Sequence, residues 1–252
     1  MYNIPKFTEH FEHRHPKIIN DHLAEIEEFT KVSFRNRRDR APLSLFSRIL
    51  SERQSLHVEV LDPLHVLLAI ALELPEDYFT SIHKYQVRSE DHLRYMMYRK
   101  YSPEQFAQLS EPIARGHTDL GSWTLLFRQP VAGLQIKDYS TNEWKWVKPQ
   151  DATLTVNACD ALNLLTAGYV KSTIHRVVVP PKDQQHVDRL GLLYFSRPRN
   201  DLKLTTITES PLLQREGFTQ NQFEATGNLV PTMEGMRSIL RTSGCSFMPL
   251  HV

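Results

Sequence analysis

A histidine and an aspartate stand two residues apart in the stretch GHTDLGSWTLLF, at His117 and Asp119. In an extended chain, the side chains of residues i and i+2 point to the same side. These two side chains can therefore bind one atom together, and an imidazole with a carboxylate suits a divalent transition metal. Two ligands do not make a site, and the same pattern recurs at His186 and Asp188. The motif needs a third ligand from elsewhere in the chain.

The candidate third ligand is His175, in the stretch KSTIHRVVVPP. Its apolar, β-branched neighbours predict a strand. Taken alone, a histidine in such a strand is more often a core or barrel-lining residue. With His117 and Asp119, however, it completes two imidazoles and one carboxylate, the facial triad that leaves open positions on Fe(II). Structural zinc sites usually have four ligands, and no fourth ligand is evident here.

The second His-x-Asp motif does not find such a partner. The one histidine that follows it is His251, the penultimate residue of the sequence as given. The motif itself lies in the polar stretch PPKDQQHVD, between two apolar segments. We therefore predict that His186 and Asp188 belong to the surface.

A further candidate, Arg189, begins the apolar stretch RLGLLYF. Arginine is rarely buried without a partner, and its planar guanidinium matches a carboxylate. Two interpretations stay open. Arg189 binds a dicarboxylate ligand, or it forms a structural salt bridge, for which Asp160 and Asp188 are the candidates.

The elements that must position these residues are mostly short strands. We expect strands at 93–101, 122–129, 133–138, 143–149, 152–158, 172–179 and 189–198. Glycine, proline, asparagine or aspartate separates most of them, and one helix is expected at 159–168, ending at Gly168. Many short strands with turn signals between them indicate a sandwich or a barrel, such as a jelly roll.

The first ninety residues show helical spacing instead. We expect helices at 17–31 and 62–74, the second with Asp62 as its N-cap and Pro63 as its first residue. A basic cluster separates them, at Arg35, Arg37, Arg38 and Arg40. We interpret this cluster as a solvated surface segment rather than a nuclear signal or a nucleic-acid patch.

The composition limits the partners and the cellular compartment that we expect for this protein. The net charge of the 252-residue chain is +1, so no overall field attracts nucleic acid or a membrane, and we expect neither as a partner. Two cysteines argue against a disulfide framework and favour a reduced, cytoplasmic setting. The longest apolar run, 66–72, is far shorter than the roughly 20 residues that span a bilayer.

The order of these residues resembles the Fe(II)/2-oxoglutarate-dependent dioxygenases of the isopenicillin N synthase-like family. The resemblance covers roughly residues 90–225. It rests on His-x-Asp, the distal histidine and the following arginine, each of which lies in a predicted strand region whose sequence is similar to that of the family. It implies a mainly β fold with flanking helices, built on a double-stranded β-helix (jelly-roll) core. We expect a helical flanking region at 1–90, the core at 91–225 and an irregular tail at 226–252.

The resemblance also implies the site and the reaction. Iron would bind His117, Asp119 and His175, and Arg189 would bind the distal carboxylate of 2-oxoglutarate, with Tyr98 near that co-substrate. The chain would use Fe(II), 2-oxoglutarate and O2, with ascorbate as a possible reductant. It would hydroxylate, desaturate or rearrange a small organic molecule, most simply one of secondary metabolism. The alternative is a truncated, catalytically impaired relative that binds a partner without turnover.

Three features depart from the family pattern. The family usually has Arg-x-Ser, and its serine touches 2-oxoglutarate; here Gly191 takes that place, so one hydrogen bond worth about 1 kcal/mol is lost or left to water. The family's Asn-x-Tyr reads Met96-Met97-Tyr98 in this chain. The region before the core is shorter than in the family, so we expect an N-terminal truncation.

Overall fold

The structure is a computed structural model that describes residues 54–100, 102, 104–105, 113–129, 131–148, 153–236 and 239. The helix expected at 17–31 and the basic cluster at 35–40 lie outside the described residues. Among the described helices, none has the length and apolar character of a membrane span.

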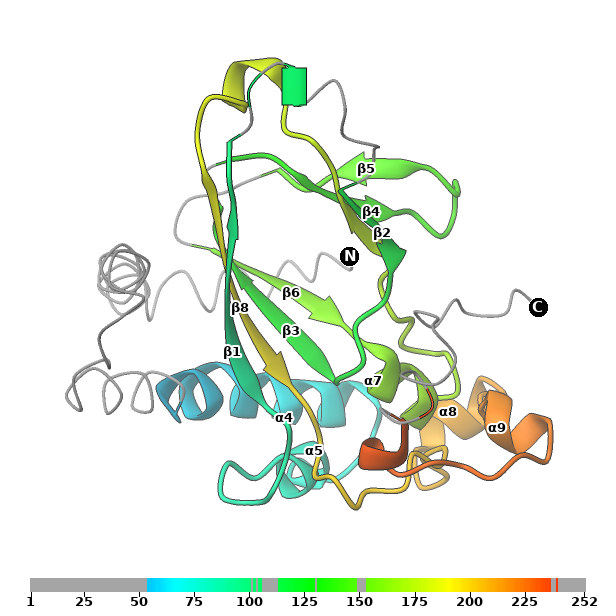
Figure 1. The fold of residues 1–252 in the computed structure, drawn as a ribbon. Helices are drawn as coiled ribbons and strands as arrows, with labels where there is room; N and C mark the ends of the chain where they lie inside the picture. Colours follow the sequence, from blue (N-terminus) through cyan, green and yellow to red (C-terminus); the bar gives the residue numbers. More distant parts are fainter. Residues whose placement is uncertain are drawn as a thin grey trace.

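Two four-stranded antiparallel sheets form the body of the fold (Figure 1). The first sheet has the order β1 (His92–Tyr98), β8 (Arg189–Ser196), β3 (Trp123–Phe127) and β6 (Leu154–Ala158). The second has the order β2 (Ala114–His117), β7 (His175–Val177), β4 (Leu134–Lys137) and β5 (Trp144–Trp146). The chain passes repeatedly from one sheet to the other, which confirms the expected jelly roll. The sequence prediction found seven of these strands within a few residues and missed β2.

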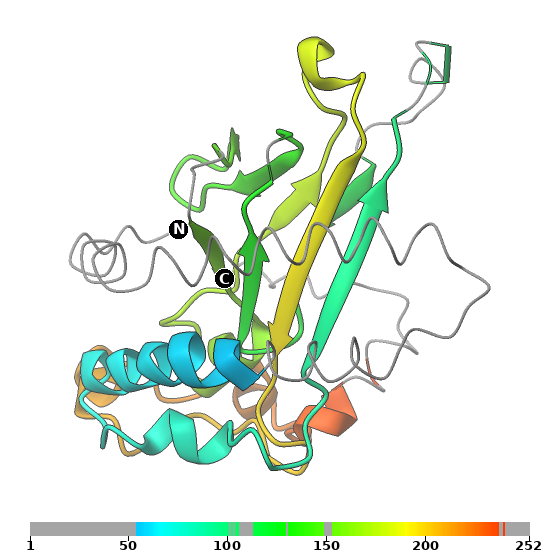
Figure 2. The same cartoon turned by 90° about the vertical axis from the view of Figure 1, so that its left-hand side faces the viewer.

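Helices gather at one end of the strands, as both views show (Figures 1 and 2). They are η1 (His57–Leu61), α4 (Asp62–Ala71), α5 (Tyr78–Ile82), α7 (Asp160–Leu165), α8 (Pro211–Arg215) and α9 (Gln222–Ala225). A short 3-10 turn, η2 (Lys182–Gln184), lies between β7 and β8 at the opposite end of the strands (Figure 1). The helix expected at 159–168 is α7, and Gly168 follows it with φ +88°. The expected N-cap at Asp62 is wrong, because the π-helical turn η1 runs directly into α4 and leaves Leu61 helical.

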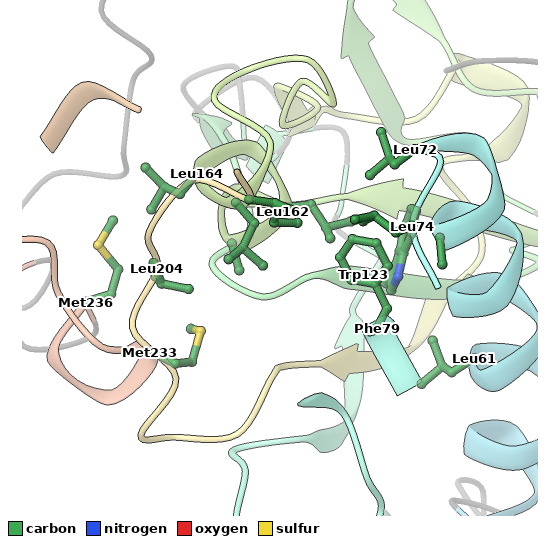
Figure 3. Packing of buried hydrophobic residues seen from close by; sticks show 14 of the residues in the cluster. Leu61, Leu72, Leu74, Phe79, Trp123, Leu162, Leu164, Leu204, Met233 and Met236 are labelled. Carbon is green, nitrogen blue, oxygen red and sulfur yellow. The ribbon is translucent and has the colours of Figure 1, made fainter. Parts of the chain in front are cut away.

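The main core lies between these helices and one face of the first sheet. Leu125 and Tyr194, on β3 and β8, are fully buried in this core. The same cluster contains Leu72 and Phe79, which Figure 3 shows. Because side chains alternate along a strand, the neighbours of these core residues, such as Thr124, lie on the opposite face of the sheet. Met233 and Met236 join the same core, so the start of the expected irregular tail is packed. The domain boundaries at 90 and 225 stay predictions.

Two histidines are stacked inside this helical region. The rings of His65 and His83 have centroids 4.1 Å apart, and both side chains are buried. His83 donates from Nδ1 to the carbonyl of Phe79 and contacts Ser122 Oγ through Nε2, at 2.8 Å each. Burial lowers the pKa of His83 to about 4 and holds the pKa of His65 well below its usual value. Both imidazoles are therefore neutral in the folded protein at neutral pH.

Candidate metal centre

His117, Asp119 and His175 meet at one point of the fold. Each residue offers one ligand atom, and these atoms all lie within 4.8 Å of one another. Asp119 Oδ1 is 4.0 Å from His117 Nε2 and 3.8 Å from His175 Nε2. The structure thus brings together the three residues that the spacing of the sequence singled out.

The strands explain how residues so distant in sequence come together. His117 is the last residue of β2 and pairs directly with His175, the first residue of β7, so both histidines belong to the second sheet. Asp119 lies beyond the end of β2, on the connection to β3. The side chains of His117 and Asp119 converge as expected, although only His117 belongs to a strand.

Hydrogen bonds hold each ligand in the orientation that a metal requires. His117 donates from Nδ1 to the carbonyl of Arg115 at 2.8 Å, and His175 donates from Nδ1 to the carbonyl of Thr173 at 3.1 Å. These bonds leave both Nε2 atoms as acceptors, the arrangement that metal-binding histidines usually have. Burial also lowers the pKa of His175, which favours its neutral, ligating form.

The carboxylate ligand is held from the first sheet. Asp119 Oδ2 accepts hydrogen bonds from Thr124 Oγ1 at 2.7 Å and from Asn157 Nδ2 at 3.0 Å. Thr124 and Asn157 pair across β3 and β6, on the sheet face opposite the core. Oδ1 is left facing the two imidazoles. Two neutral nitrogen ligands and one carboxylate oxygen fit a divalent transition metal such as Fe(II), and a hydrogen bond to the other polar atom of each side chain fixes its orientation.

A second aspartate forms hydrogen bonds with the segments that carry the metal ligands. No local pattern in the sequence predicts this role. Asp160, at the start of α7, accepts from Thr118 Oγ1 at 3.1 Å and from Ser172 Oγ at 2.5 Å. Its backbone N–H donates to the carbonyl of Asp119 at 2.9 Å. Burial raises the pKa of Asp160 to about 6, although the two hydroxyl groups oppose that shift.

Arg189 is a buried cation at the start of β8. It is 5% exposed, its Nε has no hydrogen-bond partner, and its guanidinium lies over the ring of Tyr98, 4.8 Å from the centroid. Burial lowers the pKa of Arg189. Arg189 and Tyr98 line a small pocket of about 30 Å³ together with Ile113, Val178 and Val187.

Neither carboxylate considered from the sequence pairs with Arg189. Asp160 is occupied by Thr118 and Ser172, and Asp188 accepts from Arg99 Nη1 at 2.9 Å and from the backbone N–H of Lys100 at 2.7 Å. In the part of the chain that the structure describes, no salt bridge to Arg189 is present. A buried guanidinium of this kind fits an anionic ligand.

Gly133 allows the backbone to approach this guanidinium closely. A Cβ atom at Gly133 would lie 3.1 Å from Arg189 Cζ. The second His-x-Asp motif, in contrast, stays away from the centre, and His186 is exposed as expected.

Comparison with known proteins adds the family context. Residues 83–198 match the model of the 2OG-Fe(II) oxygenase superfamily. A 2-oxoglutarate-dependent dioxygenase of Aspergillus fumigatus is 30% identical over 161 residues, which are 57% of this chain and 41% of the relative. Clavatol oxidase of Penicillium crustosum is 32% identical over 118 residues, which are 47% of this chain and 34% of the relative. The chain thus spans less than half the length of these curated relatives.

Solved structures show the same fold. A full-length Neurospora crassa protein, crystallised with alpha-KG and thymine, superposes with a TM-score of 0.62 at 27% identity, covering 80% of this chain and 56% of that one. A 2OG-Fe(II) oxygenase family protein from Caulobacter crescentus gives a TM-score of 0.58 at 23% identity, covering 73% of this chain and 56% of that one, a likeness of fold alone.

Proposed function

Because the chain belongs to the 2OG-Fe(II) oxygenase superfamily, we propose that it acts as an Fe(II)- and 2-oxoglutarate-dependent dioxygenase of the isopenicillin N synthase-like group. When bound, Fe(II) and 2-oxoglutarate supply the oxidising chemistry, in which O2 oxidises a C–H bond of a substrate while 2-oxoglutarate gives succinate and CO2. The observation that carries the proposal is the convergence of His117 Nε2, Asp119 Oδ1 and His175 Nε2.

Each residue has a defined task in this proposal. His117, Asp119 and His175 hold Fe(II), and Arg189 binds the distal carboxylate of 2-oxoglutarate. Tyr98 stacks on the guanidinium and thereby helps to orient it. Ile113, Val178 and Val187 limit the water around the ion pair, which strengthens it, although Arg99, Lys100 and Gln185 also line this pocket.

The substrate in this proposal is a small organic molecule, most simply one of secondary metabolism, that is hydroxylated, desaturated or rearranged. The thymine bound to the Neurospora crassa protein supports a small-molecule substrate. The proposal includes a cytoplasmic location, ascorbate as a reductant that keeps iron as Fe(II), and neither nucleic acid nor membrane as a partner.

Two histidines in similar sequence contexts make a matched test of the metal site. We expect His117→Ala to lower the iron bound per chain sharply under anaerobic loading. The control is His186→Ala, which changes the exposed histidine of the second His-x-Asp motif and should leave iron binding unchanged. Circular dichroism would establish that both variants are folded. Full iron retention in His117→Ala would refute the metal assignment.

The co-substrate is tested separately. Arg189→Ala removes a charge-assisted, bidentate contact, so we expect 2-oxoglutarate to bind more weakly by about 2 kcal/mol, roughly 30-fold. Iron binding should persist. Succinate formation from 2-oxoglutarate by the wild-type chain distinguishes an oxygenase from a relative that binds without turnover. An unchanged affinity in Arg189→Ala would show that this arginine has only a structural role.

A further inference from the structure

Gly191 leaves a place on one face of β8 without a side chain. It lies two residues after Arg189 on the same strand, so the two positions share a face. That face is the one opposite the core, because Leu192 and Tyr194 point into the buried clusters. The family pattern has a serine here whose hydroxyl touches 2-oxoglutarate, and this chain has none.

The space over Gly191 is filled by the carboxamide of Gln129. A Cβ atom at Gly191 would lie 2.7 Å from Gln129 Nε2, a separation that real Cβ atoms essentially never show. Gln129 is 8% exposed, and its Nε2 donates to the carbonyl of Leu190 at 3.2 Å. The amide therefore crosses from the end of β3 to β8 and lies where a serine side chain would stand.

One hydrogen of this amide remains to be accounted for. A carboxamide nitrogen carries two hydrogens, and the bond to Leu190 uses one. Among the described residues, no second acceptor for Gln129 Nε2 is present. A buried N–H group normally has an acceptor, and this one lies over Gly191, on the strand face that also carries Arg189, whose Nε has no hydrogen-bond partner.

We propose that Gln129 is a co-substrate-binding residue of this chain, whose amide donates a hydrogen bond to the carboxylate that Arg189 binds. This inference rests on the proposed function. It makes Gly191 and Gln129 a pair, because a side chain at Gly191 and the amide of Gln129 would occupy the same place. In the simplest competing view, Gln129 only fills the space and contributes no hydrogen bond to the ligand.

Gln129→Met separates these two views, since methionine has a similar length and fills the space but donates nothing. The measurement is the affinity of the iron-loaded full chain for 2-oxoglutarate, by anaerobic titration calorimetry. We expect Gln129→Met to bind about tenfold more weakly, as for a hydrogen bond to a charged group, with unchanged iron content and thermal unfolding. Gln129→Glu should bind more weakly still, because it places a second carboxylate beside the ligand.

A swap tests whether the two positions act together. Gly191→Ser alone should weaken binding, because the new side chain displaces the amide. Gln129→Ala combined with Gly191→Ser should restore the affinity to within about threefold of wild type, since the serine hydroxyl replaces the lost donor. A double variant no better than Gln129→Ala would contradict the pairing.

The outcomes for the two proposals can be told apart. If 2-oxoglutarate binds and Arg189→Ala weakens it, but Gln129→Met keeps wild-type affinity, Gln129 is a space-filling residue and this inference is wrong. If the wild-type chain does not bind 2-oxoglutarate, the proposed function fails and this inference fails with it. If the chain binds 2-oxoglutarate equally well without Arg189, the arginine has only a structural role and this inference alone is wrong.

Discussion

The stacked pair His65 and His83 should make the fold sensitive to mild acid. Both pKa values lie below the ordinary histidine value of 6.5 in the folded state, that of His83 at about 4. The unfolded chain therefore takes up protons first as the pH falls. The contribution of the pair to stability is fully present above the unfolded pKa. It decreases as the pH falls from there toward the folded pKa.

The magnitude follows from linkage. Each proton taken up only by the unfolded state lowers the free energy of unfolding by roughly 1.4 kcal/mol per pH unit. Between about pH 6.5 and pH 5 His83 therefore costs about 2 kcal/mol of the roughly 5–15 kcal/mol typical of a domain, and His65 adds to this loss because its pKa is also lowered. The repulsion between the two rings also opposes protonation in the folded state.

Urea unfolding of the metal-free chain at several pH values provides the assay. His83→Gln keeps one donor and one acceptor for the Phe79 carbonyl and Ser122 but does not titrate. We expect its stability to fall less between pH 6.5 and pH 5 than that of wild type, by about 2 kcal/mol. His186→Gln, at an exposed position, should keep the wild-type dependence. Parallel pH curves for His83→Gln and wild type would refute the reasoning.

Three further substitutions test the packing around the site. Gly121→Ala places a Cβ atom 2.3 Å from the backbone oxygen of Ser196, so urea unfolding should show a loss of about 2 kcal/mol or more; an unchanged midpoint would contradict that contact. Thr124→Val removes a hydrogen bond to the carboxylate ligand and should weaken metal binding about tenfold in a Co(II) titration, whereas an equal affinity would make the bond unimportant. Gly133→Ala crowds the buried guanidinium and should weaken 2-oxoglutarate binding while iron affinity stays the same; a loss of iron instead would point to a wider distortion.

The metal ligands can be predicted from the sequence, because metal coordination restricts the residue types and strand geometry restricts their spacing. His175 stands out in an apolar strand, and His117 with Asp119 forms a compact motif. The strand β2 is harder to see, since ARGH has four residues and none is β-branched or apolar beyond alanine. Its pairing with β7, a tertiary contact, makes it a strand.

Residues that act through long-range contacts were beyond the same reasoning. From the sequence, Asp160 is an ordinary acidic residue in the first turn of a helix. Only the tertiary structure places Thr118 and Ser172 around it. The choice between a ligand and a salt bridge for Arg189 likewise depended on where Asp188 points. The role of Gln129 over Gly191 depends on a strand end crossing its neighbour, which no local pattern encodes.

The metal ligands are divided between two layers, and this division governs how an ion could leave. His117 and His175 belong to the second sheet, whereas Asp119 is anchored by Thr124 and Asn157 of the first. An ion bound by all three residues would link the two sheets. Its residence time would therefore depend on how often the two sheets separate locally. Amide hydrogen exchange along β3 and β7 should slow in step as the ion is added.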